Sequence, residues 1–111
     1  MFTYDKNKKY TAWVEFSKDE KYLIEYFPQK KYIATKENKI DDEFGKRILN
    51  WSGIFVPING ENVALDYSAE NAKEVFIKNY EQPDVAERVV FLMNKMTSPE
   101  TFFNAGKKEK N

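Results

Sequence analysis

Two runs near the start of the chain alternate between hydrophobic and polar residues, as strands with one buried face do. The first run, residues 10–16, places three apolar side chains on one face: Ala12, Val14 and Phe16. The second run, residues 21–27, is rich in β-branched and aromatic residues and ends at Pro28, which has no N–H for a ladder hydrogen bond. Residues 17–20 between them are polar, so the pattern predicts an antiparallel hairpin with a four-residue loop.

A helical period follows, with apolar residues at spacings of four, four and three: Ile40, Phe44, Ile48 and Trp51. Acidic residues 41–43 lie in the first turn of this segment and Arg47 lies near its end, as the helix macrodipole favours. Gly45 weakens the helix by about 1 kcal/mol relative to alanine. We predict a helix from residue 40 that ends within Asn50-Trp51-Ser52-Gly53. Before it, residues 32–35 fit either a third short strand or a helical turn.

The dipeptide Asn59-Gly60 separates two apolar runs, residues 54–58 and residues 63–67. Type I′ turns prefer this dipeptide because both of their central residues take positive φ. The pattern therefore predicts a second hairpin, in which the two residues after Gly60 either lengthen the loop or form a bulge. Trp51 precedes this hairpin and is followed by a small residue and a glycine, so we expect its ring to pack where the chain reverses direction.

Start and stop signals of helices punctuate the rest of the chain. Ser68 is a suitable N-cap for a helix with an apolar stripe: Ala72, Val75, Phe76 and Tyr80. Pro83 marks the start of a second helix, whose stripe has five members: Val85, Val89, Leu92, Met93 and Met96. The short connection predicts that these two helices pack as a helical hairpin. Ser98-Pro99 then begins a short third helix, and Gly106 is placed to end it.

Together these elements predict an α+β fold in a single domain over residues 1–111. Residues 1–39 form its β-rich part, an N-terminal antiparallel β-hairpin or small sheet. Residues 40–67 hold a helix and the central hairpin. Residues 68–105 make a C-terminal helical subdomain of two to three helices, and residues 106–111 form a charged tail.

The residue types that are missing restrict the chemistry of this protein. The chain has no Cys, which excludes disulfides, thiolate nucleophiles, iron–sulfur clusters and thiolate zinc sites. It also has no His, the usual general base near neutral pH and the commonest metal ligand. Its four glycines are scattered and form neither a Walker loop nor a dinucleotide fingerprint. We therefore predict no catalytic residues, no metal site and no cofactor, and expect a protein that is not an enzyme.

The apolar runs of the chain are too short for a membrane-spanning helix. The longest uninterrupted apolar run, residues 89–93, is far shorter than the roughly 20 residues that span a bilayer. The first residues carry lysines and lack the apolar core of a secretory signal. We expect no membrane segment and a cytoplasmic location.

Charged residues offer two candidate sites. The acidic residues 41–43 suggest either an oxygen-ligand metal site or only the start of a helix. Because neighbouring residues on a helix point about 100° apart, three in a row do not converge on one ion, and the helix start is favoured. Lysines interleave with aromatic residues at Lys8-Lys9-Tyr10, with Trp13 nearby, and at Lys30-Lys31-Tyr32, as in proteins that bind single-stranded nucleic acid. Acidic residues lie beside both groups, so nucleic-acid binding is the alternative interpretation.

Several short motifs occur in a characteristic order: Asn50-Trp51-Ser52-Gly53-Ile54, Asn59-Gly60-Glu61, Tyr67-Ser68-Ala69-Glu70-Asn71-Ala72, Phe102-Phe103 and the ending Gly106-Lys107-Lys108-Glu109-Lys110-Asn111. With this order, the run from Ile40 to Asn111 resembles the tail assembly chaperones of long-tailed bacteriophages and prophages. Upstream, Trp13-Val14-Glu15-Phe16 and Tyr22-Leu23-Ile24-Glu25-Tyr26 are similar to the opening hairpin of that family.

The resemblance implies a non-catalytic protein that transiently binds a tail protein, the tape-measure or the tail-tube protein, during tail assembly in the host cytoplasm. Five apolar residues are the candidates for binding this partner: Trp51, Met93, Met96, Phe102 and Phe103. Core packing is the competing role for all five. The sequence leaves open whether the chain forms a homo-oligomer. The alternative function is a single-stranded nucleic-acid-binding module that uses the lysine- and tyrosine-rich N-terminal strands.

Overall fold

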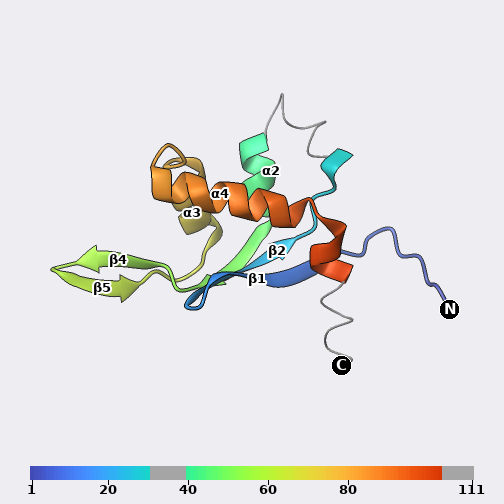
Figure 1. Ribbon diagram of the computed structural model, residues 1–111, viewed down its shortest axis with the longest axis horizontal. Coiled ribbons are helices and arrows are strands. Elements are labelled where there is room, and N and C mark those ends of the chain that lie inside the picture. Colours follow the sequence, from blue (N-terminus) through green and yellow to red (C-terminus); the bar gives the residue numbers. More distant parts are fainter. Residues whose placement is uncertain (31–39, 104–111) are drawn as a thin grey trace.

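A three-stranded antiparallel sheet forms the centre of the molecule, in the computed structural model that describes residues 1–30 and 40–103. Its strands are β1 (Thr11–Ser17), β2 (Glu20–Glu25) and β3 (Ile48–Ser52), with β2 in the middle. Helix α4 (Pro83–Met96) packs on β1 and β2 along one face of this sheet (Figure 1). Strands and helices together make the predicted α+β fold.

The first predicted hairpin is confirmed, with a shorter loop than expected. Strands β1 and β2 pair from Thr11 with Glu25 to Ser17 with Glu20, so only residues 18–19 form the turn. A bulge between Glu15 and Ser17 takes up the irregularity in register near the turn. Glu20 therefore belongs to a strand, and its side chain is buried.

The helix predicted from residue 40 ends earlier than its periodicity indicates. Helix α2 covers Ile40–Lys46 only, and Ile48 and Trp51 lie in β3, so the prediction of a helical face through these two residues is wrong. In β3, Ile48 pairs with Ile24 while Asn50 pairs with Leu23, so a bulge lies between them. This extra residue turns Ile48 and Trp51 to the same buried side although they are three positions apart. The bulge thus gives two buried strand residues a spacing of three, which also occurs in helices. The segment forms a strand because it pairs with β2.

The central hairpin is confirmed and consists of β4 (Phe55–Ile58) and β5 (Glu61–Ala64). Asn59 and Gly60 form its two-residue turn with φ of 53° and 82°, the positive values that a type I′ turn requires. The register runs without interruption from Phe55 with Ala64 to Ile58 with Glu61. Neither a longer loop nor a bulge follows Gly60.

The helical part begins at the predicted cap. The N–H of Asn71 donates to the Ser68 hydroxyl over 3.0 Å at the start of α3 (Ala69–Ala72), which continues into a π-helical turn, η1 (Lys73–Ile77). This turn packs against α4, which begins at Pro83 as expected. Tyr80 belongs to the connection after η1 and is exposed rather than part of the apolar stripe. Residues 99–103 form the start of the predicted third helix.

The core lies between the sheet and the helices. Its buried hydrophobic residues come from all parts of the fold: Ala12, Val14, Tyr22, Ile24, Phe27, Phe44, Ile48, Trp51, Ala72, Phe76, Leu92, Met96 and Phe102. Alternate residues of β1, such as Trp13, face solvent on the other side of the sheet, as the period-two pattern predicts. The predictions for residues 32–35 and for the charged tail at 106–111 fall outside the described residues.

Candidate functional site

The hairpin of β4 and β5 projects from one end of the molecule, away from α4 and the three-stranded sheet (Figure 1). Its apolar side chains are largely outside the core: Phe55 is 56% exposed, Ile58 50% and Val63 41%. Side chains alternate across a hairpin, so Phe55 lies on one face, and Ile58 and Val63 lie on the other. Exposed apolar groups gathered on one projecting element are typical of a surface that binds another protein.

A pocket of about 330 Å³ lies at the base of this hairpin. The hairpin side of the pocket is apolar, with Ile54, Phe55, Val56 and Leu65, and Val75 and Val85 from the helical part add to it. Its polar lining comes from Tyr22 and three charged residues, Glu20, Asp84 and Arg88. We call the pocket and the exposed apolar residues of β4 and β5 together the hairpin surface. The pocket therefore combines an apolar lining with a few charged groups, as ligand-binding pockets commonly do.

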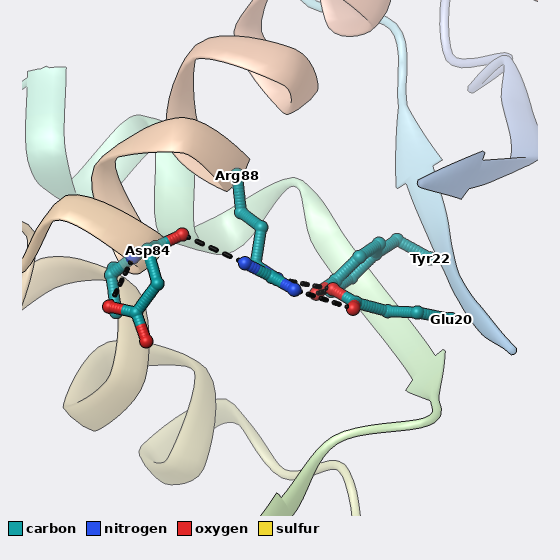
Figure 2. A network of polar contacts seen from close by, with 5 residues as sticks. Glu20, Tyr22, Asp84 and Arg88 are labelled. Carbon is teal, nitrogen blue, oxygen red and sulfur yellow. Dashed lines mark hydrogen bonds and ion pairs between the residues drawn. The ribbon is translucent and has the colours of Figure 1, made fainter. Parts of the chain in front are cut away.

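A charged network holds the wall of this pocket in place (Figure 2). The guanidinium of Arg88 donates to both carboxylate oxygens of Glu20, from Nε over 2.6 Å and from Nη2 over 2.9 Å. Its Nη1 donates to the carbonyl oxygen of Asp84, one turn earlier in α4, over 2.9 Å. The hydroxyl of Tyr22 donates to Glu20 as well. Two-pronged pairing between Arg and a carboxylate fixes both side chains, so α4 is bound to β2 at this point.

Two groups of the network, the Tyr22 hydroxyl and the Arg88 guanidinium, have raised pKa values. Burial raises the pKa of the Tyr22 hydroxyl well above its ordinary value of 10.0, and the hydrogen bond to Glu20 and the charge of Glu20 raise it further. The hydrogen bond to Glu20 is the main reason why the pKa of Arg88 is also raised. The phenol and the guanidinium therefore stay protonated at neutral pH and act as fixed hydrogen-bond donors.

Three of the five residues predicted to bind a partner lie in the core. Trp51 is buried, and its Nε1 donates to the carbonyl oxygen of Leu65 over 2.7 Å. Met96 and Phe102 are buried as well. In this conformation the three side chains pack inside the molecule and are not accessible at its surface.

Met93 and Phe103 are the predicted residues with accessible side chains. Met93 is half-buried, and Phe103 is 50% exposed. The ring of Phe103 meets that of Tyr10 edge-on, with ring centroids 5.5 Å apart. The helical segment 99–103 lies beyond the C-terminal end of α4, away from the hairpin of β4 and β5 (Figure 1). The five residues therefore do not form one surface, and Phe103 is separate from the hairpin surface.

Lysines and aromatic residues in the first hairpin and just before it form two exposed pairs. The Lys8 ammonium lies 5.2 Å from the centroid of the Tyr10 ring, and the Lys21 ammonium lies 4.9 Å from the Trp13 ring. Glu15 is the cross-strand neighbour of Lys21 and lies on the same exposed face. This carboxylate opposes the binding of phosphate next to Trp13.

Sequence reasoning predicted the hairpin but missed its side chains as a candidate surface. The signal was present: residues 54–58 are apolar without alternation, although a two-stranded hairpin has no second layer to bury both faces. The pairing of Glu20 with Arg88 has no such signal, because 68 positions separate the two residues.

Within residues 1–30 and 40–103, no three acidic side chains are grouped so that they would hold a metal ion. Over the same residues, every helix is too short or too polar to cross a membrane. Comparisons of the chain with family models, curated proteins and solved structures give no match.

Proposed function

We propose that this protein is a non-catalytic binding protein of the tail assembly chaperone type, which transiently holds tape-measure or tail-tube protein during the assembly of a phage tail. The observation that carries the proposal is the projecting hairpin of β4 and β5, with Phe55, Ile58 and Val63 outside the core. Two of the motifs behind the family resemblance border this hairpin. The motif at residues 50–54 leads into β4, and Asn59-Gly60-Glu61 contains the two-residue turn and the first residue of β5.

The physical chemistry of the hairpin surface suits a client of this kind. A long helical client exposes apolar stripes until it is assembled, and these stripes need an apolar partner in the meantime. The hairpin offers Phe55 and Ile58 as projecting side chains, and the pocket below them accepts a side chain in return. A contact made by a few exposed apolar side chains and one pocket is small, so we expect binding of moderate strength that permits release.

The charged network supports a binding role over a catalytic one. Glu20, an acid that lines the pocket, accepts hydrogen bonds from Arg88 and Tyr22 on both of its oxygens. A carboxylate paired in this way orients its neighbours and has little free capacity to remove a proton from a substrate.

Co-expression with a client fragment tests the proposal. If a very long reading frame for a coiled-coil protein lies next to this gene, fragments of that frame are the clients to use. We expect the chain to raise the soluble yield of a fragment several-fold. The variant Phe55→Asp/Ile58→Asp should remove most of this gain, because charges on both faces of the hairpin oppose apolar contact.

Val90→Asp is the matched control, because Val90 is 61% exposed on α4 and does not line the pocket. It adds one charge at a different apolar site, as Phe55→Asp alone does on the hairpin, and should leave the soluble yield unchanged, whereas Phe55→Asp alone should lower it. An equal loss in both variants, or no gain with the unmodified chain, would count against the hairpin as the binding surface.

The exposed pairs of Lys8 with Tyr10 and Lys21 with Trp13 favour a second candidate function, the binding of single-stranded nucleic acid. Fluorescence anisotropy with a labelled oligonucleotide tests it. Binding that weakens steeply with added salt, and that Trp13→Ala reduces, would support this function. The acidic neighbour of Lys21 leads us to expect weak binding that Trp13→Ala leaves unchanged.

A further inference from the structure

The outer edge of β5 has backbone groups that the hairpin does not use. In a two-residue hairpin the residues next to the turn, Ile58 and Glu61, form a hydrogen-bonded pair, and such pairs then alternate along the strands. The bond from the N–H of Leu65 to the carbonyl of Ile54, 2.8 Å long, fits this alternation. The N–H and C=O groups of Asn62 and Ala64 therefore point outward.

The two edges of this hairpin differ. On β4, the residue opposite Asn62 is Pro57, which has no N–H to offer a further strand. On β5, every residue from Glu61 to Ala64 is exposed, and in the described part of the chain β5 pairs with β4 alone. An unpaired, exposed edge of this kind accepts an extended segment by strand addition.

Residues 1–5 have the form of such a segment. They form neither helix nor turn and are exposed, and two aromatic side chains lie two positions apart, Phe2 at 84% and Tyr4 at 75% exposed. A turn follows, in which the N–H of Lys8 donates to the carbonyl of Asp5 over 3.1 Å. Leaving two large apolar side chains in water is unfavourable, so the segment gains from burial against a partner.

The residues after the segment and those around the hairpin carry opposite charges. Three lysines, Lys6, Lys8 and Lys9, follow the apolar segment directly. Residues 48–72, which contain the whole hairpin, have no basic residue and three acidic ones, Glu61, Asp66 and Glu70. Opposite charges on the two partners favour their encounter and orientation.

The segment and the hairpin of one chain lie at opposite ends of the molecule. Residues 1–9 emerge at the end of the long axis opposite the hairpin, and the three-stranded sheet lies between them (Figure 1). Pairing within one chain would require the segment to fold back along the sheet. The contact that leaves both elements in place is therefore between two copies.

We propose that residues 1–5 of one copy add as a third strand to the edge of β5 of a second copy, so that the chains associate head to tail. A third strand stabilises a hairpin that is marginal with two strands. Because each copy keeps one free segment and one free edge, the association continues to further copies. This inference goes beyond the proposed function: it concerns the backbone edge of β5, whereas a client would contact the side chains of the hairpin surface.

Light scattering after size-exclusion chromatography tests the inference by the mass of the particles. We expect the mass of the unmodified chain to rise with concentration above the 13.2 kDa of one copy. A variant lacking residues 1–9 and the variant Ala64→Pro should each remain monomeric. The proline removes only an outward N–H, so the ladder within the hairpin stays intact.

Mixing these two variants gives the decisive result. The first variant retains a free edge and the second a free segment, so together they should form a heterodimer of twice the single-chain mass and no larger species. Ala64→Ser, which keeps the N–H, is the control and should associate like the unmodified chain. Asn62→Pro replaces Ala64→Pro if circular dichroism shows that the latter is unfolded.

An unmodified chain that stays monomeric at every concentration would overturn the inference, and so would a mixture that forms no heterodimer. Neither result bears on the proposed function, because the variant lacking residues 1–9 keeps the hairpin surface. That variant should still raise the yield of the client fragment if the proposed function is correct.

Discussion

Gly53 shows how closely the backbone is packed where β3 leads into β4. Its φ of +96° is one that side chains disfavour, and a β-carbon there would overlap the carbonyl oxygen of Asp19 and lie 2.9 Å from the Cα of Glu20. The turn between β1 and β2 therefore lies directly against this glycine. Because Glu20 is part of the charged network, the close approach also positions the wall of the pocket.

Gly53→Ala should lower the free energy of unfolding more than Gly60→Ala does. Gly60 also has positive φ, at +82°, but has no neighbour within 4 Å, so its substitution costs only the backbone strain of about 1 kcal/mol. Gly53→Ala adds a collision with backbone, for a further ~1–3 kcal/mol. Urea denaturation of the two variants measures the difference, and equal losses would show that the close approach has no energetic effect.

The raised pKa of Tyr22 should make the free energy of unfolding fall at alkaline pH. The pKa of Tyr22 is raised in the folded state, so above about pH 10 the unfolded chain loses a proton that the folded chain keeps. The free energy of unfolding then falls as the pH rises, by up to about 1.4 kcal/mol per pH unit from this group. Urea denaturation from about pH 8 to about pH 11 should give a shallower fall for Tyr22→Phe. The same slope in both proteins would contradict the assignment.

Compared with the three-stranded sheet, the hairpin of β4 and β5 is less buried and is paired with fewer strands. Strand β2 is paired on both sides and has fully buried side chains, whereas all of β5 is exposed. Two-stranded hairpins are marginal in water, and this one is attached to the core mainly at its base, where Trp51 donates to the carbonyl of Leu65. An element of this kind can adapt to a partner without disturbing the sheet.

Amide hydrogen exchange should show this difference. We expect the amides of Glu61–Ala64 to exchange with a lower free energy of opening than those of Glu20–Glu25. Within β5, at low protein concentration, Asn62 and Ala64 should exchange faster than Val63, because only the last donates within the hairpin. Two-dimensional NMR spectra recorded after transfer to D₂O measure these rates. Protection of β5 equal to that of β2 would show that the hairpin is part of the core.

In the whole molecule, α4 joins the parts of the fold. Leu92 and Met96 are fully buried under it, and Arg88 pairs with Glu20 of β2. At its C-terminal end, the carbonyl of Met96 accepts a hydrogen bond of 2.8 Å from the N–H of Phe27. The sheet and the helical part therefore share a common core.

Met96→Ala should lower the free energy of unfolding by about 2–5 kcal/mol, because it leaves a cavity in that core. Val90→Ala, at an exposed position of the same helix, should change it by less than about 0.5 kcal/mol. Thermal denaturation compares the two variants. A small effect of Met96→Ala would favour the role in partner binding that its sequence suggested.

Local signals alone were enough to predict the β1–β2 hairpin, the Asn59-Gly60 turn, the Ser68 cap and the start of α4 at Pro83. Each of these depends on the conformational preference of a few adjacent residues, which the sequence contains in full. Contacts between distant segments decided the rest. Pairing with β2 made Ile48 and Trp51 part of a bulged strand, and the fold placed Glu20 beside Arg88. Trp51 is buried and Phe55 is exposed because other segments of the folded chain cover the first ring and not the second. The pattern of apolar residues in the sequence does not distinguish these two cases.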